Sequence, residues 1–412
     1  MMRSRFPFAL LLLLAAVAGC HQEAPPVDFR QPLPPGMVAL RKISPAEYPD
    51  FGQQPIDAAS LEASIDNSLQ YLSAPSSQNF YPYLDITHER AVASLVRLKQ
   101  ICQRSDQRGA WDGAWFNQQI DDNFEVYESI GAPTPDGTDY TSKVLFTGYF
   151  TPIYDASLTR TADYQWPLYK VPPDLARNAA TGQVYGRRAI DGSIVPYYTR
   201  AQIETGGKLA GDELVWLKSR WEAYVITVQG SARLRLADSG KIYEIGFAGT
   251  NGYTYTSPGE QMVADGVITQ DQLSFKGLAD YFAAHPDAMD KYLSINQRYV
   301  FFTERPGGPF GSLNVPVTPW ATIATDKEQR DIYPRAMPAF VCVDVPQETG
   351  DGFRPLRSFL LDQDTGGAIR ASGRCDIYMG IGPQAEIVAG HEVQQGTLYY
   401  LAIRPELMQA AK

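Results

Sequence analysis

The sequence predicts a mainly β protein with α-helical additions, divided into two domains. Its 412 residues exceed what one typical hydrophobic core covers, and 44% of them are hydrophobic, which is enough to bury two cores. Helical periodicity is densest before residue 131, whereas runs of β-branched and aromatic residues dominate after Val144. We therefore expect helices at the N-terminal side and β-rich domains after them.

Composition narrows the class of partner. The chain has 36 basic and 46 acidic residues, a formal net charge of −10 that is spread along its length. We therefore expect no nucleic-acid partner. The 24 Tyr, 18 Phe and six Trp suit stacking on sugar rings, and they suit an ordinary β-rich core equally well.

The N-terminus has the features of an export signal. Arg3 and Arg5 precede an apolar stretch, residues 6–17, which is too short to span a membrane, and Cys20 follows Val-Ala-Gly. This pattern resembles the lipobox of bacterial lipoproteins, and a plain secretory signal with a chance cysteine is the alternative. We expect a signal peptide over residues 1–19, lipidation of Cys20, and a proline-rich tether over residues 20–45. His21 in place of Asp after the cysteine predicts sorting to the outer membrane.

The remaining cysteines predict no metal site. Cys102, Cys342 and Cys375 are odd in number and lack the spacing of metal ligands. We expect at least one free thiol, no zinc and no cofactor.

Three helices are expected before residue 131. Asp57 is a plausible N-cap for the first, which Pro75 ends. The second runs from about Glu89 to Cys102, with His88 as a surface or capping residue. The third carries apolar residues at helical spacing and ends at Gly131. Its apolar residues are Phe116, Ile120, Phe124 and Tyr127.

Strands are expected from Val144 on. Gly148 interrupts the first, residues 144–152, and indicates either a bulge or ligand approach, or a kinked core strand. Residues 167–173 and 195–198 contain prolines and belong at edges or in loops. Residues 224–231 alternate and predict a strand, joined by a turn at 237–240 to a second strand at 241–245. Ser257 is expected to cap a short helix that ends at Asp265, and more helix follows up to His285. Further strands are expected at residues 299–304 and 321–326.

Two aspartates follow strand-like segments near the C-terminus. Asp364 comes after the apolar run 359–361 and precedes Gly366 and Gly367, which permit a turn with positive φ and close approach of another chain. Residues 374–379 alternate, so Arg374, Asp376 and Tyr378 would share one face of a strand. A partly dehydrated carboxyl on such a wall keeps its proton, as a general acid must. The alternative is a turn aspartate and a solvent-facing one.

Six motifs in order resemble the lytic murein transglycosylase A family. They lie at residues 146–152, 228–231, 299–302, 324–326, 364–369 and 376–378. The resemblance implies a double-psi β-barrel domain with three aspartates, interrupted by an inserted β-rich domain, and a glycan strand in the groove between them. It places the helical part and first barrel strands at 46–152, the insert at 153–298 and the three-aspartate barrel at 299–412. Residues 332–338 depart from the usual turn of the family.

The resemblance also implies the site. Asp376 is the acid; Asp364 holds Asp376 or Tyr378 and acts by like charge, and Asp326 is supporting. One acid/base suffices, because the muramoyl O6 replaces water as nucleophile and 1,6-anhydro-N-acetylmuramic acid ends result. Contacts with the sugars are expected from a further set of residues: Thr147, Gly148, Tyr149, Gln229, Gly230, Ser231, Gly366, Gly367 and Tyr378.

The implied partners follow from this activity. They are peptidoglycan glycan strands, the outer membrane through lipidated Cys20 on its periplasmic face, and proteins of cell-wall synthesis and hydrolysis. Two alternatives stay open. A muramidase-like hydrolase would need a second carboxylate, with Glu304 or Asp326 as candidates, and a non-catalytic peptidoglycan-binding lipoprotein would tolerate loss of Asp376.

Overall fold

A closed β-barrel forms the centre of the computed structural model, which describes residues 27–178, 182–327, 332–349 and 351–411. Six strands hydrogen-bond in the order β17-β14-β15-β13-β16-β3, and β3 pairs with β17 to close the ring. β2 and β1 extend the sheet beyond β17. The strands are β1 (Leu40–Lys42), β2 (Phe124–Ser129), β3 (Val144–Thr151), β13 (Thr322–Ala324), β14 (Pro338–Pro346), β15 (Phe353–Asp364), β16 (Arg374–Ile381) and β17 (Val393–Ile403). The predicted barrel domain is confirmed.

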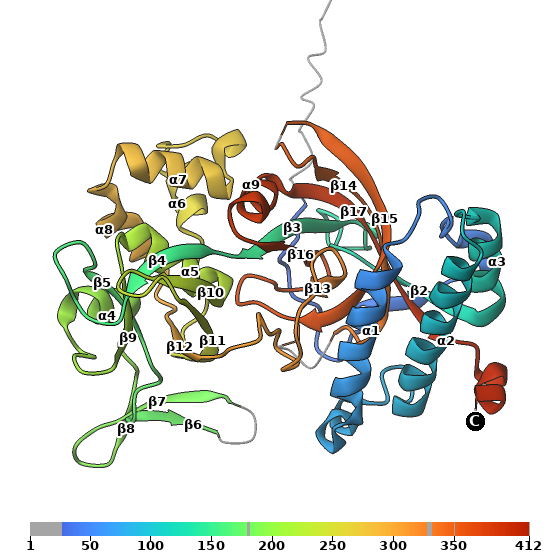
Figure 1. Cartoon of the computed structure of the whole chain (residues 1–412), viewed down its shortest axis with the longest axis horizontal. Helices are drawn as coiled ribbons and strands as arrows, with labels where there is room; N and C mark the ends of the chain where they lie inside the picture. The colour runs from blue at the N-terminus through green and yellow to red at the C-terminus, as the bar shows by residue number, and fades with distance from the viewer. Residues whose placement is uncertain (1–26, 179–181, 328–331, 350, 412) are drawn as a thin grey trace, which may run out of the picture.

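Helices cover the outside of this barrel. α1 (Ala58–Ser73) packs against β15, and α2 (His88–Gln107) packs against β17 (Figure 1). The Asp57 side chain accepts from Ser60 N at 3.2 Å, as expected of its N-cap, whereas Thr87 caps α2. α9 (Pro383–His391), which the sequence did not predict, packs on β3 and β16.

The predicted third helix is too long. α3 (Gly113–Asn123) ends at Asn123, and the chain continues as β2, where Phe124 and Tyr127 are buried. Apolar residues at 116, 120, 124 and 127 fit helical spacing, but the last two satisfy a strand as well. Pairing of β2 with both β1 and β17 decides the outcome.

The second lobe is a β domain with its own helices (Figure 1, left). Its six-stranded sheet has the order β12-β11-β10-β4-β9-β5, and a separate three-stranded sheet, β6-β7-β8, extends from it. The strands are β4 (Ile153–Ser157), β5 (Trp166–Tyr169), β6 (Leu175–Arg177), β7 (Val184–Arg188), β8 (Ile194–Val195), β9 (Glu213–Leu217), β10 (Ser231–Leu236), β11 (Ile242–Thr250) and β12 (Val300–Glu304). The helices are α4 (Arg200–Gly206), α5 (Arg220–Gln229), α6 (Pro258–Ala264), α7 (Phe275–Ala284) and α8 (Ala288–Leu293). β5 lies at the sheet edge, as its proline predicts, and Ser257 caps α6.

Two expected boundaries are wrong. β12 pairs with β11, with Phe302 opposite Phe247, so residues 300–304 belong to the insert sheet and not to the barrel. The tether expected up to residue 45 is too long, because β1 pairs with β2 from Leu40 and Ala39 is fully buried. Cys20 and the signal segment lie outside the described residues. Within the described part of the chain, no helix is both long and apolar enough to cross a membrane.

The strand predicted over residues 224–231 is a helix. α5 occupies Arg220–Gln229, and Gly230 ends it with φ of 81°. Residues 224–227 are all buried, so this short apolar run has no polar face from which its period could be read. The Ser219 capping box, with Glu222 at its third position, begins the helix. The hairpin itself is confirmed, but its first strand is β10, which pairs with β11.

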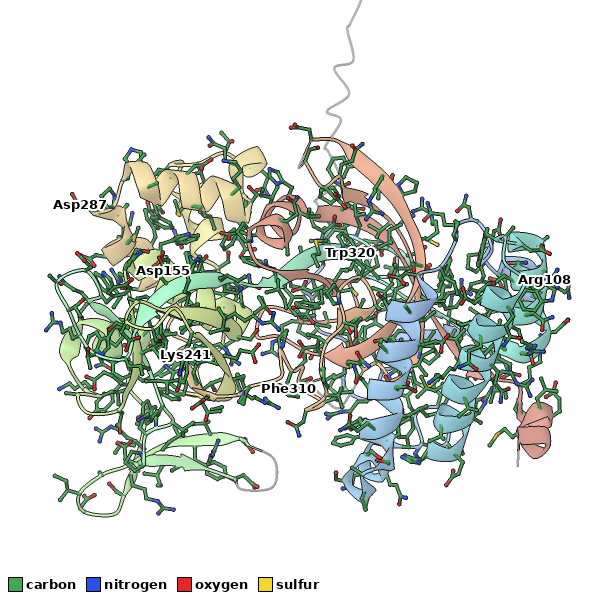
Figure 2. The ribbon with its side chains drawn as sticks, in the orientation of Figure 1. Arg108, Asp155, Lys241, Asp287, Phe310 and Trp320 are labelled. Carbon is green, nitrogen blue, oxygen red and sulfur yellow. The ribbon has the colours of Figure 1, made fainter. Side chains whose placement is uncertain are left out.

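Each lobe has its own hydrophobic core. Phe340, Phe359 and Leu361 belong to the core of the barrel lobe, whereas Leu234 and Phe302 belong to that of the insert. Figure 2 places Phe310 between the two lobes. Because the chain crosses from one core to the other near residues 152 and 305, both crossings pass beside the groove described below.

Candidate active site

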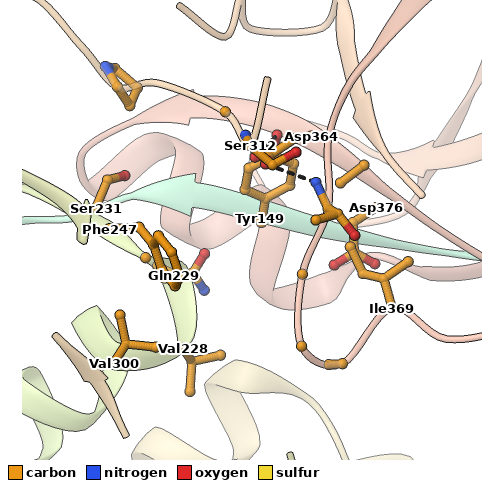
Figure 3. A pocket seen from close by; sticks show the side chains of 18 of the residues that line it. Tyr149, Val228, Gln229, Ser231, Phe247, Val300, Ser312, Asp364, Ile369 and Asp376 are labelled. Atoms are coloured by element: carbon orange, nitrogen blue, oxygen red, sulfur yellow. Dashed lines mark hydrogen bonds between the residues drawn. The ribbon is translucent and has the colours of Figure 1, made fainter. Parts of the chain in front are cut away.

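A cavity of about 320 Å³ lies between the barrel and the insert. Figure 3 shows Asp364, Asp376 and Ile369 on one side of it and Val228, Gln229 and Phe247 on the other. The barrel supplies both acids, and α5 with β11 supplies the facing wall. The expected groove between the domains is therefore present.

Sheet register places the two aspartates in one row. Ala324 on β13 pairs with Asp364 on β15 and with Asp376 on β16, and Asp376 pairs in turn with Thr147 on β3. Residues directly opposite in a sheet share a face, so Asp364 and Asp376 flank the small Ala324 side chain on the cavity wall. Two strand spacings separate their Cα atoms, which is about 10 Å.

Asp376 is held through one oxygen. Thr147 Oγ1 donates a hydrogen bond to Asp376 Oδ1, and Arg374 Nη2 lies 3.3 Å from the same atom. Arg374 Nη2 also donates to Thr147 Oγ1 at 2.9 Å. The side chain of Asp376 is 16% exposed, and among the described residues no donor contacts Oδ2. One carboxylate oxygen is thus fixed and the other is left for the cavity.

Asp364 is satisfied by three donors. Ser312 N lies 2.7 Å and Thr365 N lies 2.8 Å from Oδ1, and the Tyr149 hydroxyl lies 3.0 Å from Oδ2. Burial raises the pKa of Asp364 above its ordinary value, against the opposing effect of these donors. Burial and the nearby Asp364 raise the pKa of Tyr149 well above its usual range, so Tyr149 keeps its proton and donates.

Asp326 lies apart from the cavity. Its side chain is 3% exposed, Oδ2 accepts from Ala371 N at 3.0 Å, and Arg370 Nη1 lies 3.8 Å from Oδ1. These contacts tie β13 to the segment that leads into β16. The structure does not bring Asp326 together with Asp364 and Asp376 among the cavity residues.

Aromatic and amide side chains complete the cavity. The rings of Tyr149 and Tyr378 lie 5.0 Å apart, and Tyr378 contacts Thr151 at 3.0 Å through its hydroxyl. Gln229 Oε1 accepts from Phe150 N at 3.1 Å, which fixes the end of α5 against β3. Gln229, Gly230 and Ser231 all line the cavity, as expected of sugar-contacting residues.

Glycines have packing roles that the sequence did not distinguish. A Cβ on Gly148 would lie 2.7 Å from Ala389 Cα, so Gly148 admits α9, and neither it nor Thr147 lines the cavity. Gly148 therefore has a role in helix packing, and the sugar contacts expected of Thr147 and Gly148 stay predictions. Gly366 and Gly367 do line the cavity, but neither has a positive φ. A Cβ on Gly367 would lie 2.8 Å from Arg298 Nε, so the lack of a side chain leaves room for the Arg298 guanidinium.

A buried ion pair behind the cavity was missed. Lys327 pairs with Asp362, with side chains 2% and 0% exposed. Lys327 Nζ also donates to Thr325 Oγ1 and to the Asp364 carbonyl oxygen, each at 2.9 Å. Asp362 Oδ2 accepts from Thr325 and Tyr400 at 2.7 Å. The pair holds the backbone from which the Asp364 side chain extends.

Comparison with known proteins agrees with this geometry. A family model described as the MltA specific insert domain matches residues 145–303, and one described as the 3D domain matches residues 321–402. The membrane-bound lytic murein transglycosylase A of Vibrio cholerae is 28% identical over 302 residues, which cover 72% of this chain and 75% of the relative. The protein of the same name from Escherichia coli strain K12 is 28% identical over 280 residues, 67% of this chain and 70% of the relative.

Solved structures share the fold. A membrane-bound lytic murein transglycosylase from Agrobacterium tumefaciens has a TM-score of 0.71 at 24% identity, over 91% of this chain and 100% of that one. The structure of E. coli MltA with bound chitohexaose has a TM-score of 0.68 at 23% identity, over 93% and 98%.

Proposed function

The chain belongs to the membrane-bound lytic murein transglycosylase A family, and from this premise we propose that it cleaves the β-1,4 bond between N-acetylmuramic acid and N-acetylglucosamine in peptidoglycan without water. The product ends would be 1,6-anhydro-N-acetylmuramic acid. The observation that carries this proposal is the state of the two cavity carboxylates. Asp376 has an oxygen without a protein donor among the described residues, whereas three donors occupy both oxygens of Asp364.

Asp376 acts as the acid and then as the base. Its Oδ2 donates a proton to the glycosidic oxygen as the bond to the muramoyl C1 breaks. The O6 hydroxyl of the same muramoyl residue attacks C1, and Asp376, now a carboxylate, accepts the O6 proton. Because nucleophile and electrophile belong to one sugar, proximity replaces the activation of an external water. Thr147 and Arg374 fix the other oxygen and so orient the carboxyl.

Asp364 has a supporting role in this scheme. Its burial and its contact with Tyr149 join β15 to β3 across the barrel wall, and thereby fix the walls on both sides of Asp376. Asp326 is structural, since Ala371 and Arg370 contact it away from the cavity.

The sugar contacts come from both lobes. Tyr149, Tyr378, Gly366 and Gly367 line the barrel side of the cavity, and Gln229, Gly230 and Ser231 line the insert side. We assign residues 153–304 to the insert, since β4 and β12 both belong to its sheet. A glycan strand between the lobes would contact both sets. The chitohexaose bound by E. coli MltA is a sugar chain of the kind that this cavity would take.

A hydrolase has less support. Such an enzyme usually uses a second carboxylate to activate water. Of the two candidates, Glu304 is exposed and Asp326 is buried, and neither lines the cavity.

We further propose that lipidated Cys20 anchors the protein to the periplasmic face of the outer membrane. The family name of the relatives, membrane-bound, supports membrane association. The test is Cys20→Ala, which should release the protein into the soluble periplasmic fraction and leave activity on isolated sacculi unchanged. Retention of this variant in the membrane fraction would contradict the anchor.

The product test uses purified sacculi. Mass spectrometry of the released muropeptides should show ends that are one water lighter than hydrolysis products and resist borohydride. Asp376→Asn should lower activity by orders of magnitude, because the proton donor is lost while the shape is kept. Asp364→Asn should lower activity less, because it disturbs the contacts with Ser312 and Tyr149 and leaves the proton donor in place. Asp287→Asn, on the exposed far side of the insert, is the control. Reducible ends as the main product would refute the intramolecular mechanism.

A further inference from the structure

An arginine without an acidic partner lies at the edge of the cavity. Arg305 directly follows β12, is half-buried and lines the cavity. It takes part in none of the ion pairs among the described residues. Its guanidinium carbon lies 4.4 Å from the centre of the Phe310 ring, and Nη2 donates to Asn314 Oδ1. We call these three residues the Arg305 platform. A guanidinium has five N–H donors, and Asn314 is its one side-chain acceptor in the described part of the chain.

The Arg305 platform is fixed relative to Asp364 on the cavity wall. Asn314 adopts φ of 62° in a tight turn, with its N–H donating to Gly311 O at 2.9 Å. In the same turn Ser312 N donates to Asp364 Oδ1 at 2.7 Å. The loop that places Phe310 and Asn314 beside Arg305 thus also binds the Asp364 carboxyl. Whatever the guanidinium holds is positioned with respect to Asp364.

Charge distribution makes this the place for an anion. The two cavity acids, Asp364 and Asp376, are both on the barrel strands β15 and β16. Arg200 and Arg298 also line the cavity, but Arg200 is 1% exposed and paired with Glu204 at 2.8 Å, and Arg298 Nη1 donates to the Tyr253 carbonyl oxygen at 3.3 Å. Burial lowers the pKa of Arg305, and no acid opposes that effect. The guanidinium is planar and lies over the Phe310 ring, so its free edge can form two parallel hydrogen bonds.

We propose that the Arg305 platform binds a carboxylate carried by the glycan strand and thereby selects carboxylate-bearing substrate. This inference rests on the proposed function, because the ligand is a substituent of the same polymer. Two sources supply the chemistry: the free lactyl carboxylate of a muramoyl residue that has lost its peptide, and a carboxylate of an attached stem peptide. A neutral sugar chain offers neither.

Three substrates distinguish these sources. The first is soluble glycan that keeps its peptides, and the second is the same glycan after an amidase has removed them, which leaves lactyl carboxylates. The third is the stripped glycan after its lactyl carboxylates have been converted to amides. KM and kcat are measured on each for wild type, Arg305→Gln and Arg305→Lys. Far-UV circular dichroism checks that the variants fold.

Arg305→Gln should raise KM about tenfold on the substrate that carries the recognised carboxylate, with kcat little changed, because a charge-assisted bidentate contact is lost. Arg305→Lys should recover part of the loss, since it keeps the charge without the planar fork. On the amidated glycan the variants and the wild type should have the same KM. Arg354→Gln is the matched control: Arg354 also stacks on an aromatic ring, Trp320 at 5.0 Å, but does not line the cavity.

The three substrates distinguish the two sources of the carboxylate. A KM penalty on the peptide-bearing glycan alone assigns the site to a stem-peptide carboxylate, and a penalty on the stripped glycan alone assigns it to the lactyl group. Equal penalties on all three substrates, or none on any, overturn the proposal. Mass spectrometry of the wild-type products in the same digests reports on anhydro ends. The proposed function can therefore fail while the carboxylate preference stands, and the reverse.

Discussion

Removing the Lys327 ammonium should strongly destabilise the barrel lobe, because it leaves a buried carboxylate without its partner. In Lys327→Met the methyl end fills part of the space, but Asp362 is left charged with its side chain 0% exposed. Breaking a buried ion pair by removing one partner costs about 3–5 kcal/mol. Domains are commonly stable by about 5–15 kcal/mol, so about a fifth or more of the stability is at stake.

The structure suggests the upper part of that range. Lys327 Nζ has three acceptors, and Thr325 Oγ1 loses this donor as well, whereas the Asp364 carbonyl oxygen keeps the Thr325 N–H as a second donor at 3.2 Å. Tyr400 and Thr325 still donate to Asp362 Oδ2 at 2.7 Å, which limits the loss. Asp362→Asn should also be destabilising, because it leaves the ammonium buried. The double variant Lys327→Met with Asp362→Asn removes both charges and should regain most of the stability.

The assay is urea unfolding of the four proteins at pH 7, arranged as a double-mutant cycle. A loss under about 1 kcal/mol in Lys327→Met, or additive losses in the double variant, would show that the two charges are not coupled. A second readout is independent of stability. The positive charge of Lys327 lowers the pKa of Asp364, so its removal should shift the titration of Asp364 to higher pH.

Three further variants test other parts of the structure. Glu392 is 1% exposed, has no hydrogen-bond partner for its carboxyl in the described part of the chain, and burial raises its pKa to about 9. Because the folded state holds this proton more tightly than the unfolded state, wild-type stability should fall by about 1.4 kcal/mol per pH unit between roughly pH 4.5 and 9. In Glu392→Gln that slope should vanish in urea unfolding across this range, and an unchanged slope would contradict the burial argument. Gly148→Ala should cost about 1–3 kcal/mol and reduce activity, since its Cβ would meet the α9 backbone beside Thr147, whereas Gly206→Ala, whose Cβ would meet only the flexible Lys208 side chain, should cost little. Gln229→Ala should weaken sacculus pull-down while Asp376→Asn still binds. Equal loss of binding in both variants would contradict the separation of substrate binding, assigned to Gln229, from proton transfer, assigned to Asp376.

Sequence rules that use only neighbouring residues predicted the helix caps and the alternation of β16. Asp57 and Ser257 were recognised as N-caps from residue type and position, and their side chains accept from the backbone three residues on. The alternation in β16 was enough to place Arg374, Asp376 and Tyr378 together. The shared face of these three residues follows from the two-residue period of a strand. This period can be read from the sequence without knowing which strands lie beside β16.

Features that depend on pairing between distant segments could not be predicted in this way. The Lys327–Asp362 pair requires the parallel register of β13 and β15, and Asp362 follows the apolar run 359–361 without any local signal of a charged partner. The contacts of Arg305 could not be predicted for the same reason, since Phe310 and Asn314 become its neighbours only when the loop after β12 turns back. The strand prediction over residues 224–231 was wrong for a different reason. The capping box at Ser219 was a local signal that could have identified α5 as a helix.

Asp364, Ala324, Asp376 and Thr147 lie in one row of the sheet, and this row accounts for the different roles that we propose for two aspartates twelve positions apart in the sequence. The chain suggests a close pair, but β13 inserts Ala324 between them. With Cα atoms about 10 Å apart, they do not form the kind of adjacent dyad that shares a proton. Asp364 instead acts through what it holds: the loop at Ser312 on one side and Tyr149 on the other. Asp376 takes its orientation from Thr147 and Arg374 and keeps one oxygen for the substrate. A single proton-transferring carboxyl is therefore what this sheet register favours, in agreement with the proposed mechanism, in which the substrate supplies its own nucleophile.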